Sequence, residues 1–268
     1  MIKLLDDLKV FEHFENAEPY FSAFFSAPAT AFINDPDLMS IWVQYDEHEV
    51  PRAMLYANTD SLLLFTDGTA PDMEILIFLT NIVAGGGIEN IDCDDTSFPV
   101  LKNLFPEAEI EEAVQMVCEK PIPIEENRFE VRKSDNISDV SAILAEVFGK
   151  KDSNSLDLWK LRTVRGVLRG QNTLFTLYAD GKAVATASIR GRTKTSGSIT
   201  SVVTLPEHRG KGYASYLTTL CSNMLLDEHR KPWLVPANPG VQKMYEKLGY
   251  KAVKNYNCLH FIEKEEKK

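Results

Sequence analysis

The chain has 268 residues, of which 44% are hydrophobic and 25% are charged, so it suits one large globular domain or two of ordinary size. No apolar run is long enough to cross a bilayer, and the N-terminus lacks the charge layout and cleavage site of a signal peptide. The four cysteines are far apart and form no Cys-x-x-Cys pair, which argues against a structural zinc site or a disulfide framework and favours a cytoplasmic protein.

The net charge of −10 is distributed unevenly along the chain. Residues 1–124 hold 23 acidic and 5 basic side chains, whereas residues 125–268 hold 16 acidic and 24 basic ones. Two halves of opposite sign indicate two domains with different roles. The basic half suits an anionic cofactor, and the acidic half either attracts a cationic substrate such as an amine or only keeps the protein soluble. Because the basic excess is small and contains no long basic run, we expect no nucleic-acid binding.

The first half alternates short strands with helices. The pattern predicts strands at residues 40–44, 53–56, 61–66 and 88–92, and helices at residues 73–83 and 98–104. Gly85-Gly86-Gly87 follows a helix, so we interpret it as the end of that helix and not as a binding loop. Pro121 and Pro123 disfavour a helix in the segment that contains them and favour an extended linker. We therefore place a domain boundary after residue 124.

The second half has a longer series of elements. Helices are predicted at residues 134–148 and 155–168, a strand at 173–178, a turn at 180–182, and strands at 184–190 and 199–204. A long amphipathic helix follows residue 213, and then come a strand at 232–235, a helix at 241–248 ended by Gly249, and a last strand at 257–262.

The segment between the strand at 199–204 and the long helix carries the clearest functional signal. It reads Arg209-Gly210-Lys211-Gly212-Tyr213-Ala214. The first amides of a helix have no internal partner, glycines let an anion approach them, and the helix dipole favours negative charge there. The spacing fits neither the dinucleotide nor the nucleoside-triphosphate glycine motif. The sequence therefore predicts a site for another phosphate-bearing ligand.

The order Arg-x-x-Gly-x-Ala resembles the pyrophosphate loop of the GNAT superfamily of N-acetyltransferases, which binds acetyl-coenzyme A. Residues 202–214 are similar to the fourth strand and loop of that family, and Asn238-Pro239, Tyr245 and Gly249-Tyr250 are similar to its second motif block. The resemblance covers roughly the last half of the chain. It implies that residues 125–268 form an acetyl-CoA-binding catalytic domain of the α/β class, with a mixed central sheet flanked by helices.

The first half repeats part of this rhythm without the motif. Asp67 and Asp72, which lie between a strand and a helix, would repel a pyrophosphate. We interpret residues 1–124 as a second, degenerate GNAT-like unit that binds no cofactor, so that the chain consists of two tandem GNAT-like domains. An unrelated α/β domain is the alternative.

The resemblance also assigns the cofactor contacts. It gives the backbone amides of Val202, Val203 and Thr204 to the pantetheine arm and the thioester carbonyl. It gives the pyrophosphate to the loop and the first helical turn, namely Arg209, Gly210, Lys211, Gly212, Tyr213, Ala214 and Ser215. Asn238 either caps the following helix or touches the pantetheine. No metal is implied.

Tyr245 stands where the family has its catalytic tyrosine. A phenol titrates near ~10, so at neutral pH it is protonated and able to donate to a departing thiolate. The alternative is a packing role beside Met244 and Leu248. No general base is evident, because residues 196–204 contain no carboxylate. Glu207 and His208 lie nearer the phosphates, and the remaining options are His260, unless it is structural, or a water chain through Thr200 or Ser201.

The resemblance implies an acetyl-CoA-dependent N-acetyltransferase that acts on a primary amine of a small molecule or peptide. One alternative is a non-catalytic acyl-CoA-binding regulatory module, and another is an acyltransferase that uses a longer acyl-CoA, such as one transferring to glycine. By analogy with the family, acceptor specificity falls to residues 148–169 and 252–261. We expect a monomer or a homodimer without membrane attachment.

Overall fold

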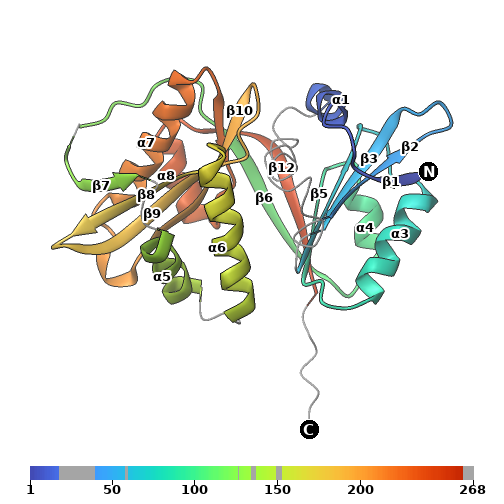
Figure 1. Cartoon of the computed structure of the whole chain (residues 1–268), viewed down its shortest axis with the longest axis horizontal. Coiled ribbons are helices and arrows are strands. Elements are labelled where there is room, and N and C mark those ends of the chain that lie inside the picture. The colour runs from blue at the N-terminus through green and yellow to red at the C-terminus, as the bar shows by residue number, and fades with distance from the viewer. Residues whose placement is uncertain (18–39, 58–59, 126, 134–136, 149–152, 262–268) are drawn as a thin grey trace, which may run out of the picture. The chain divides into compact units, whose positions relative to one another are not determined.

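The computed structural model describes residues 1–17, 40–57, 60–125, 127–133, 137–148 and 153–261 (Figure 1). The chain divides into two compact units, one made of Met1–Val114 with the chain from Lys254 onward, and the other of Gln115–Val253. We call them unit 1 and unit 2. The chain passes into unit 2 within β6 (Glu109–Val117) and returns to unit 1 within β12 (Lys251–His260). This division differs from the predicted domains 1–124 and 125–268, because the end of β12 pairs with β5 of unit 1.

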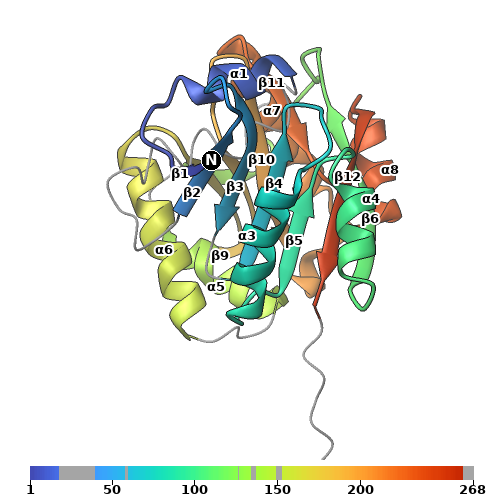
Figure 2. The ribbon, with the colours of Figure 1, turned by 90° about the vertical axis from the view of Figure 1, so that its right-hand side faces the viewer.

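Unit 1 contains a mixed sheet in the order β1-β2-β3-β4-β5-β12-β6, in which β4 and β5 are parallel. Its other elements are β1 (Ile2–Leu4), α1 (Val10–Ala17), β2 (Ser40–Tyr45), β3 (Pro51–Ala57), β4 (Ser61–Thr66), α3 (Met73–Ala84), β5 (Asn90–Cys93) and α4 (Phe98–Leu104). Alternate residues of a strand point to opposite faces. Accordingly Leu55 packs with α3 and α4, which is the side shown in Figure 2, and Met54 packs with α1.

In unit 1, the side chain of Asp72 occupies the N-terminus of α3. Its side chain caps α3, accepting hydrogen bonds from the amides of Glu74 at 2.9 Å and Ile75 at 3.2 Å. Gln44 donates a third hydrogen bond to it at 2.7 Å. The positive end of α3 therefore already holds a carboxylate from the chain.

A second acidic residue of unit 1, Asp92 on β5, gives a pH-dependent prediction. Burial raises its pKa, and hydrogen bonding with Cys258 and Tyr256 of β12 opposes this rise. A carboxyl whose pKa is raised by folding destabilises the protein as pH rises above its unfolded value, near ~3.9. We expect Asp92→Asn to be more stable than the wild type at pH 7, with the difference shrinking as pH falls toward 4.

Urea unfolding of Asp92→Asn and wild type at several pH values measures this difference. Asp6→Asn is the matched control, because Asp6 is exposed and its replacement should leave the pH dependence unchanged. An Asp92→Asn variant that loses stability at pH 7 and keeps the wild-type pH dependence would contradict the prediction.

Unit 2 contains a sheet in the order β6-β11-β10-β9-β8-β7, in which β10 and β11 are parallel. Its other elements are β7 (Glu130–Lys133), α5 (Ile137–Phe148), α6 (Ser153–Leu168), β8 (Thr173–Ala179), β9 (Lys182–Arg190), β10 (Ser196–Thr204), the 3-10 helix η1 (Pro206–His208), α7 (Tyr213–Asp227), β11 (Lys231–Leu234) and α8 (Pro239–Lys247). None of the helices in the described ranges is long and apolar enough to span a membrane.

Contacts of two strand residues show which helix covers which face of this sheet. A Cβ added to Gly197 of β10 would lie 2.4 Å from the side chain of Leu225, so this residue faces α7. Arg190 of β9 donates to Thr163 Oγ1 at 3.2 Å and lies over the ring of Trp159, so it faces α6. The sheet therefore lies between α7 on one face and α6 on the other (Figure 1).

The predicted mixed α/β fold, a sheet flanked by helices, is confirmed. The predicted strand at 61–66 and helix at 98–104 have the observed bounds of β4 and α4. Five of the described elements were not predicted, namely β1, α1, β6, β7 and η1. The predicted ends at Ser134 and Ile262, and residues 149–152 of the expected specificity segment, lie outside the described residues.

Candidate functional site

The edge of β10 opens toward β11 after a short stretch of pairing. The two strands pair only from Ser196 with Lys231 to Ser198 with Trp233. The rest of β10 continues to pair with β9 on its other side, with a bulge between Thr200 and Val203 where Ser201 has a positive φ of 53°. A bulge redirects the backbone and leaves a residue unpaired. The segment predicted to meet the pantetheine, Val202 to Thr204, therefore begins within a bulge on a strand with an open edge.

The glycine-rich loop follows this open strand directly. Gly210 and Gly212 have φ values of 77° and 82°, a left-handed conformation that costs glycine little. Gly212 precedes the first residue of α7 and supplies no side-chain cap. In the described part of the chain, no backbone amide of residues 210–215 donates a hydrogen bond. The loop thus presents free amides at the positive end of a helix, as an anion-binding site requires.

Two basic side chains flank these amides. Arg209 donates from Nε to the carbonyl oxygen of Thr204 at 3.2 Å, which ties the loop to the end of β10. Lys211 is exposed and makes no ion pair with any described residue. Both positive charges therefore lie beside the free amides, where they add to the attraction for a phosphate.

Asn238 lies at the start of the second motif block. Its side-chain oxygen accepts a hydrogen bond from the amide of Val241 at 3.0 Å, so Asn238 caps α8. The sequence left two roles open for Asn238, the cap of a helix and contact with the pantetheine. The structure shows it as the cap of α8.

Tyr245 lies on α8 and is 4% exposed. Its ring lies 5.8 Å from that of Tyr250, whose hydroxyl is hydrogen-bonded to Ser222 at 2.6 Å. Burial raises the pKa of Tyr245, with a smaller contribution from Cys221, while the side chain of Thr218 opposes the rise. The phenol is consequently protonated throughout the neutral range, as a proton donor must be.

The candidates for a general base lie in different places. Glu207 and His208 belong to η1 beside the loop, with 3.8 Å between their side chains. His260 belongs to unit 1, where its ring contacts Asn90 at 2.5 Å and Glu111 at 2.9 Å. These two contacts hold the His260 ring, which fits the structural role considered for it.

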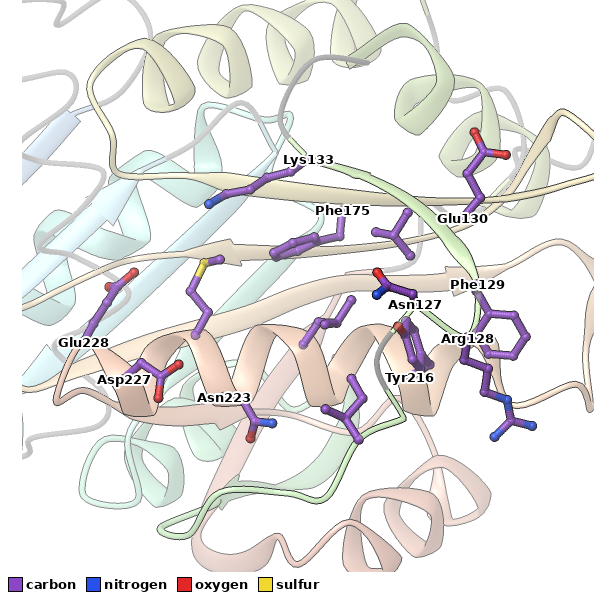
Figure 3. A pocket seen from close by; sticks show the side chains of 14 residues that line it. Asn127, Arg128, Phe129, Glu130, Lys133, Phe175, Tyr216, Asn223, Asp227 and Glu228 are labelled. Carbon is purple, nitrogen blue, oxygen red and sulfur yellow. The ribbon is translucent and has the colours of Figure 1, made fainter.

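An open cavity of about 1080 Å³ lies elsewhere in unit 2, between α7, β7 and the segment that precedes β7 (Figure 3). Its wall includes Lys133, Phe175 and Tyr216, and Asn223 holds the preceding segment through two 2.8 Å hydrogen bonds to the backbone of Ile122. None of the predicted cofactor or catalytic residues lines it. No pattern in the sequence predicts this cavity, because β7 was not predicted.

Part of unit 2 is similar in sequence to a known protein family. Residues 139–250 match the profile of the Acetyltransferase (GNAT) family. These residues form a GNAT acetyltransferase domain. The domain contains both motif blocks, the loop at 209–214 and the segment from Asn238 to Tyr250, and members of this family transfer acyl groups from acyl-CoA. All of unit 1 lies outside the matched range.

Several solved structures share the fold of nearly the whole chain. A Drosophila protein is 14% identical with a TM-score of 0.64, covering 97% of this chain and 98% of its own. A GCN5-related N-acetyltransferase from Sphaerobacter thermophilus has the same identity and TM-score, covering 97% and 95%. A tandem GNAT protein from the clavulanic acid biosynthesis pathway is 11% identical with a TM-score of 0.62, covering 97% of each chain. No curated protein matches the chain.

Proposed function

We propose that this protein transfers an acetyl group from acetyl-CoA to a primary amine of a small molecule or peptide. The observation that carries the proposal is the set of free amides at residues 210–215, at the start of α7 and directly after the open edge of β10. A bound acyl-CoA would supply the activated thioester. The fit is chemical as well as spatial, since free amides, a helix N-terminus and two basic side chains all favour a pyrophosphate.

In this proposal the loop and strand β10 bind different parts of acetyl-CoA. The loop amides, with Arg209 and Lys211 beside them, hold the phosphates. The backbone of Val202 to Thr204, on the edge of β10 that leaves β11, orients the acyl end. Backbone donors fixed in this way stabilise negative charge that develops on a carbonyl oxygen, because they need no reorganisation during the reaction.

Tyr245 is the proposed general acid. Its buried phenol stays protonated at neutral pH and delivers its proton to the leaving sulfur. The amine must be neutral when it attacks, and no carboxylate on β10 removes its proton. Water that contacts the hydroxyl of Thr200 is the proposed route for that proton.

We also interpret unit 1 as a degenerate GNAT-like unit without a cofactor. Two observations support this interpretation: the helix start at α3 is capped by Asp72, and the fold of the whole chain is like that of a tandem GNAT protein.

The proposal is tested by titrating the purified protein with CoA and acetyl-CoA in a calorimeter, and by assaying thiol release from acetyl-CoA against a panel of primary amines. We expect saturable binding of both and amine-dependent thiol release. Butyryl-CoA and octanoyl-CoA, run in parallel, identify an enzyme for longer acyl chains. CoA binding without thiol release for any amine or acyl chain would indicate a regulatory module, and the absence of CoA binding would overturn the proposal.

A further inference from the structure

Buried polar atoms without partners gather in one part of unit 2. Gln115 of β6 and Ser188 of β9 are 0% exposed. Within the described ranges, the Gln115 carboxamide nitrogen and oxygen, the Ser188 hydroxyl and the Thr200 hydroxyl are all buried and make no hydrogen bond. Buried polar groups in proteins are almost always hydrogen-bonded, so a water or a ligand from outside the chain is a candidate partner for each of these groups.

The register of the sheet puts these three side chains on one face. Thr200 lies opposite Ser188 across the antiparallel pair β10 and β9. Trp233 lies beside Ser198 on one side and opposite Val117 on the other. Because side chains alternate along a strand, Thr200 shares the face of Ser198, and Gln115 shares the face of Val117. Gln115, Thr200 and Ser188 therefore point to the same side of the sheet.

That side is the face covered by α6. Arg190 follows Ser188 by two residues on β9 and contacts Thr163 and Trp159 of α6. Gly197, which precedes Ser198, faces α7 instead. The helix that carries the phosphate loop and the three polar side chains thus lie on opposite faces of the sheet.

The same register also shows how far along the strands these three side chains lie. Thr200 and Gln115 each lie two residues beyond the row of Ser198, Trp233 and Val117, so they are level with Val235, the residue after the end of β11. At this level β10 and β11 no longer pair, and the bulge of β10 begins just beyond it. Gln115 on one side and Thr200 with Ser188 on the other therefore flank the opening between the two strands.

We propose that Gln115, Thr200 and Ser188 form the subsite that holds the acceptor, and that this acceptor is a small amine with a carbonyl or carboxylate oxygen beside its nitrogen, such as an amino acid or an amino-acid amide. This inference rests on the proposed function. The Gln115 nitrogen donates to the acceptor's oxygen, and the Gln115 oxygen and the two hydroxyls accept from its amine. The three groups are uncharged and Arg190 on the same face is positive, so the subsite favours a neutral amine over an ammonium ion.

Kinetics with glycinamide and propylamine as acceptors test this assignment. We expect the wild type to prefer glycinamide. Gln115→Met and Thr200→Val should each raise the KM for glycinamide about 3- to 10-fold, as loss of one hydrogen bond predicts, and reduce the preference over propylamine. Thr200→Val should also lower kcat, because its hydroxyl contacts the water proposed to take the amine's proton. The dissociation constant for CoA should stay within about twofold, since the loop on the α7 side is untouched. Ser97→Ala is the matched control, because Ser97 of unit 1 also has a buried hydroxyl without a partner among the described residues.

A second measurement does not depend on turnover. With CoA present, addition of glycinamide should shift the NMR signals of the Gln115 side-chain amide, which are identified by their absence from Gln115→Met. Shifts without any change in KM, unchanged signals, or equal use of propylamine and glycinamide by the wild type would each overturn the subsite. Such a result would leave the proposed function intact, because that depends on CoA binding and thiol release, which are measured separately.

Discussion

Gly212→Val should weaken CoA binding roughly 10- to 100-fold, because a left-handed backbone costs a β-branched residue about 1–3 kcal/mol and a tenfold change corresponds to about 1.4 kcal/mol. Gly212 has a φ of 82°, and a Cβ built on it meets no atom within 4 Å. The new side chain would therefore project into the open space before the free amides. It would both strain the loop and hinder the approach of a phosphate.

Gly68→Val is the matched control for this prediction. Gly68 lies in unit 1, has a φ of 93°, and likewise has no atom within 4 Å of an added Cβ. Both variants should lose similar thermal stability, but only Gly212→Val should lose affinity for CoA in calorimetry. Equal CoA affinity for Gly212→Val and the wild type would show that the amides after Gly212 are not the phosphate site.

The loop and its flanking elements were predictable because their signals are local. A β-branched strand, two glycines and an amphipathic helix follow one another within residues 199–225, and each depends on neighbours in sequence. Strand β6 carries no such signal. Glu111 and Glu112 interrupt any apolar alternation, and the strand is defined by its pairing with β11, which is far away in the chain.

The pairing of the last strand could not be predicted from local sequence either. Its apolar pattern predicted a strand near residues 257–262, but nothing in the pattern specified its neighbour. Asn257 to His260 pair with β5, so this part of the chain belongs to unit 1. Pairing between strands distant in sequence depends on the whole fold, and local periodicity does not encode it.

The same distinction between local and long-range signals applies to the candidate site. The spacing of Asn238 and Tyr245 was visible in the sequence, as was the option that Asn238 caps a helix, because Asn before Pro is a local signal. The burial of Gln115 was not visible, since it depends on β6 lying beside β11. The open edge of β10 was not visible either, because residues 199–204 alone specify a strand and not its partners.

Tyr245→Phe should lower kcat about 100-fold or more, because general acid catalysis contributes roughly 10²- to 10⁴-fold. The phenylalanine ring fills the same volume and keeps the contact with Tyr250, so CoA affinity should remain within about twofold. Burial raises the pKa of Tyr245, and the wild-type rate should therefore show no loss from ionisation of this phenol below about pH 10.

Tyr250→Phe separates this role from packing. The Tyr250 hydroxyl is hydrogen-bonded to Ser222, so its loss should cost about 1 kcal/mol of stability and leave kcat unchanged. Steady-state thiol release and urea unfolding of both variants measure the two effects. If Tyr245→Phe keeps the wild-type kcat, or if Tyr250→Phe loses as much of it, the phenol of Tyr245 does not protonate the leaving sulfur.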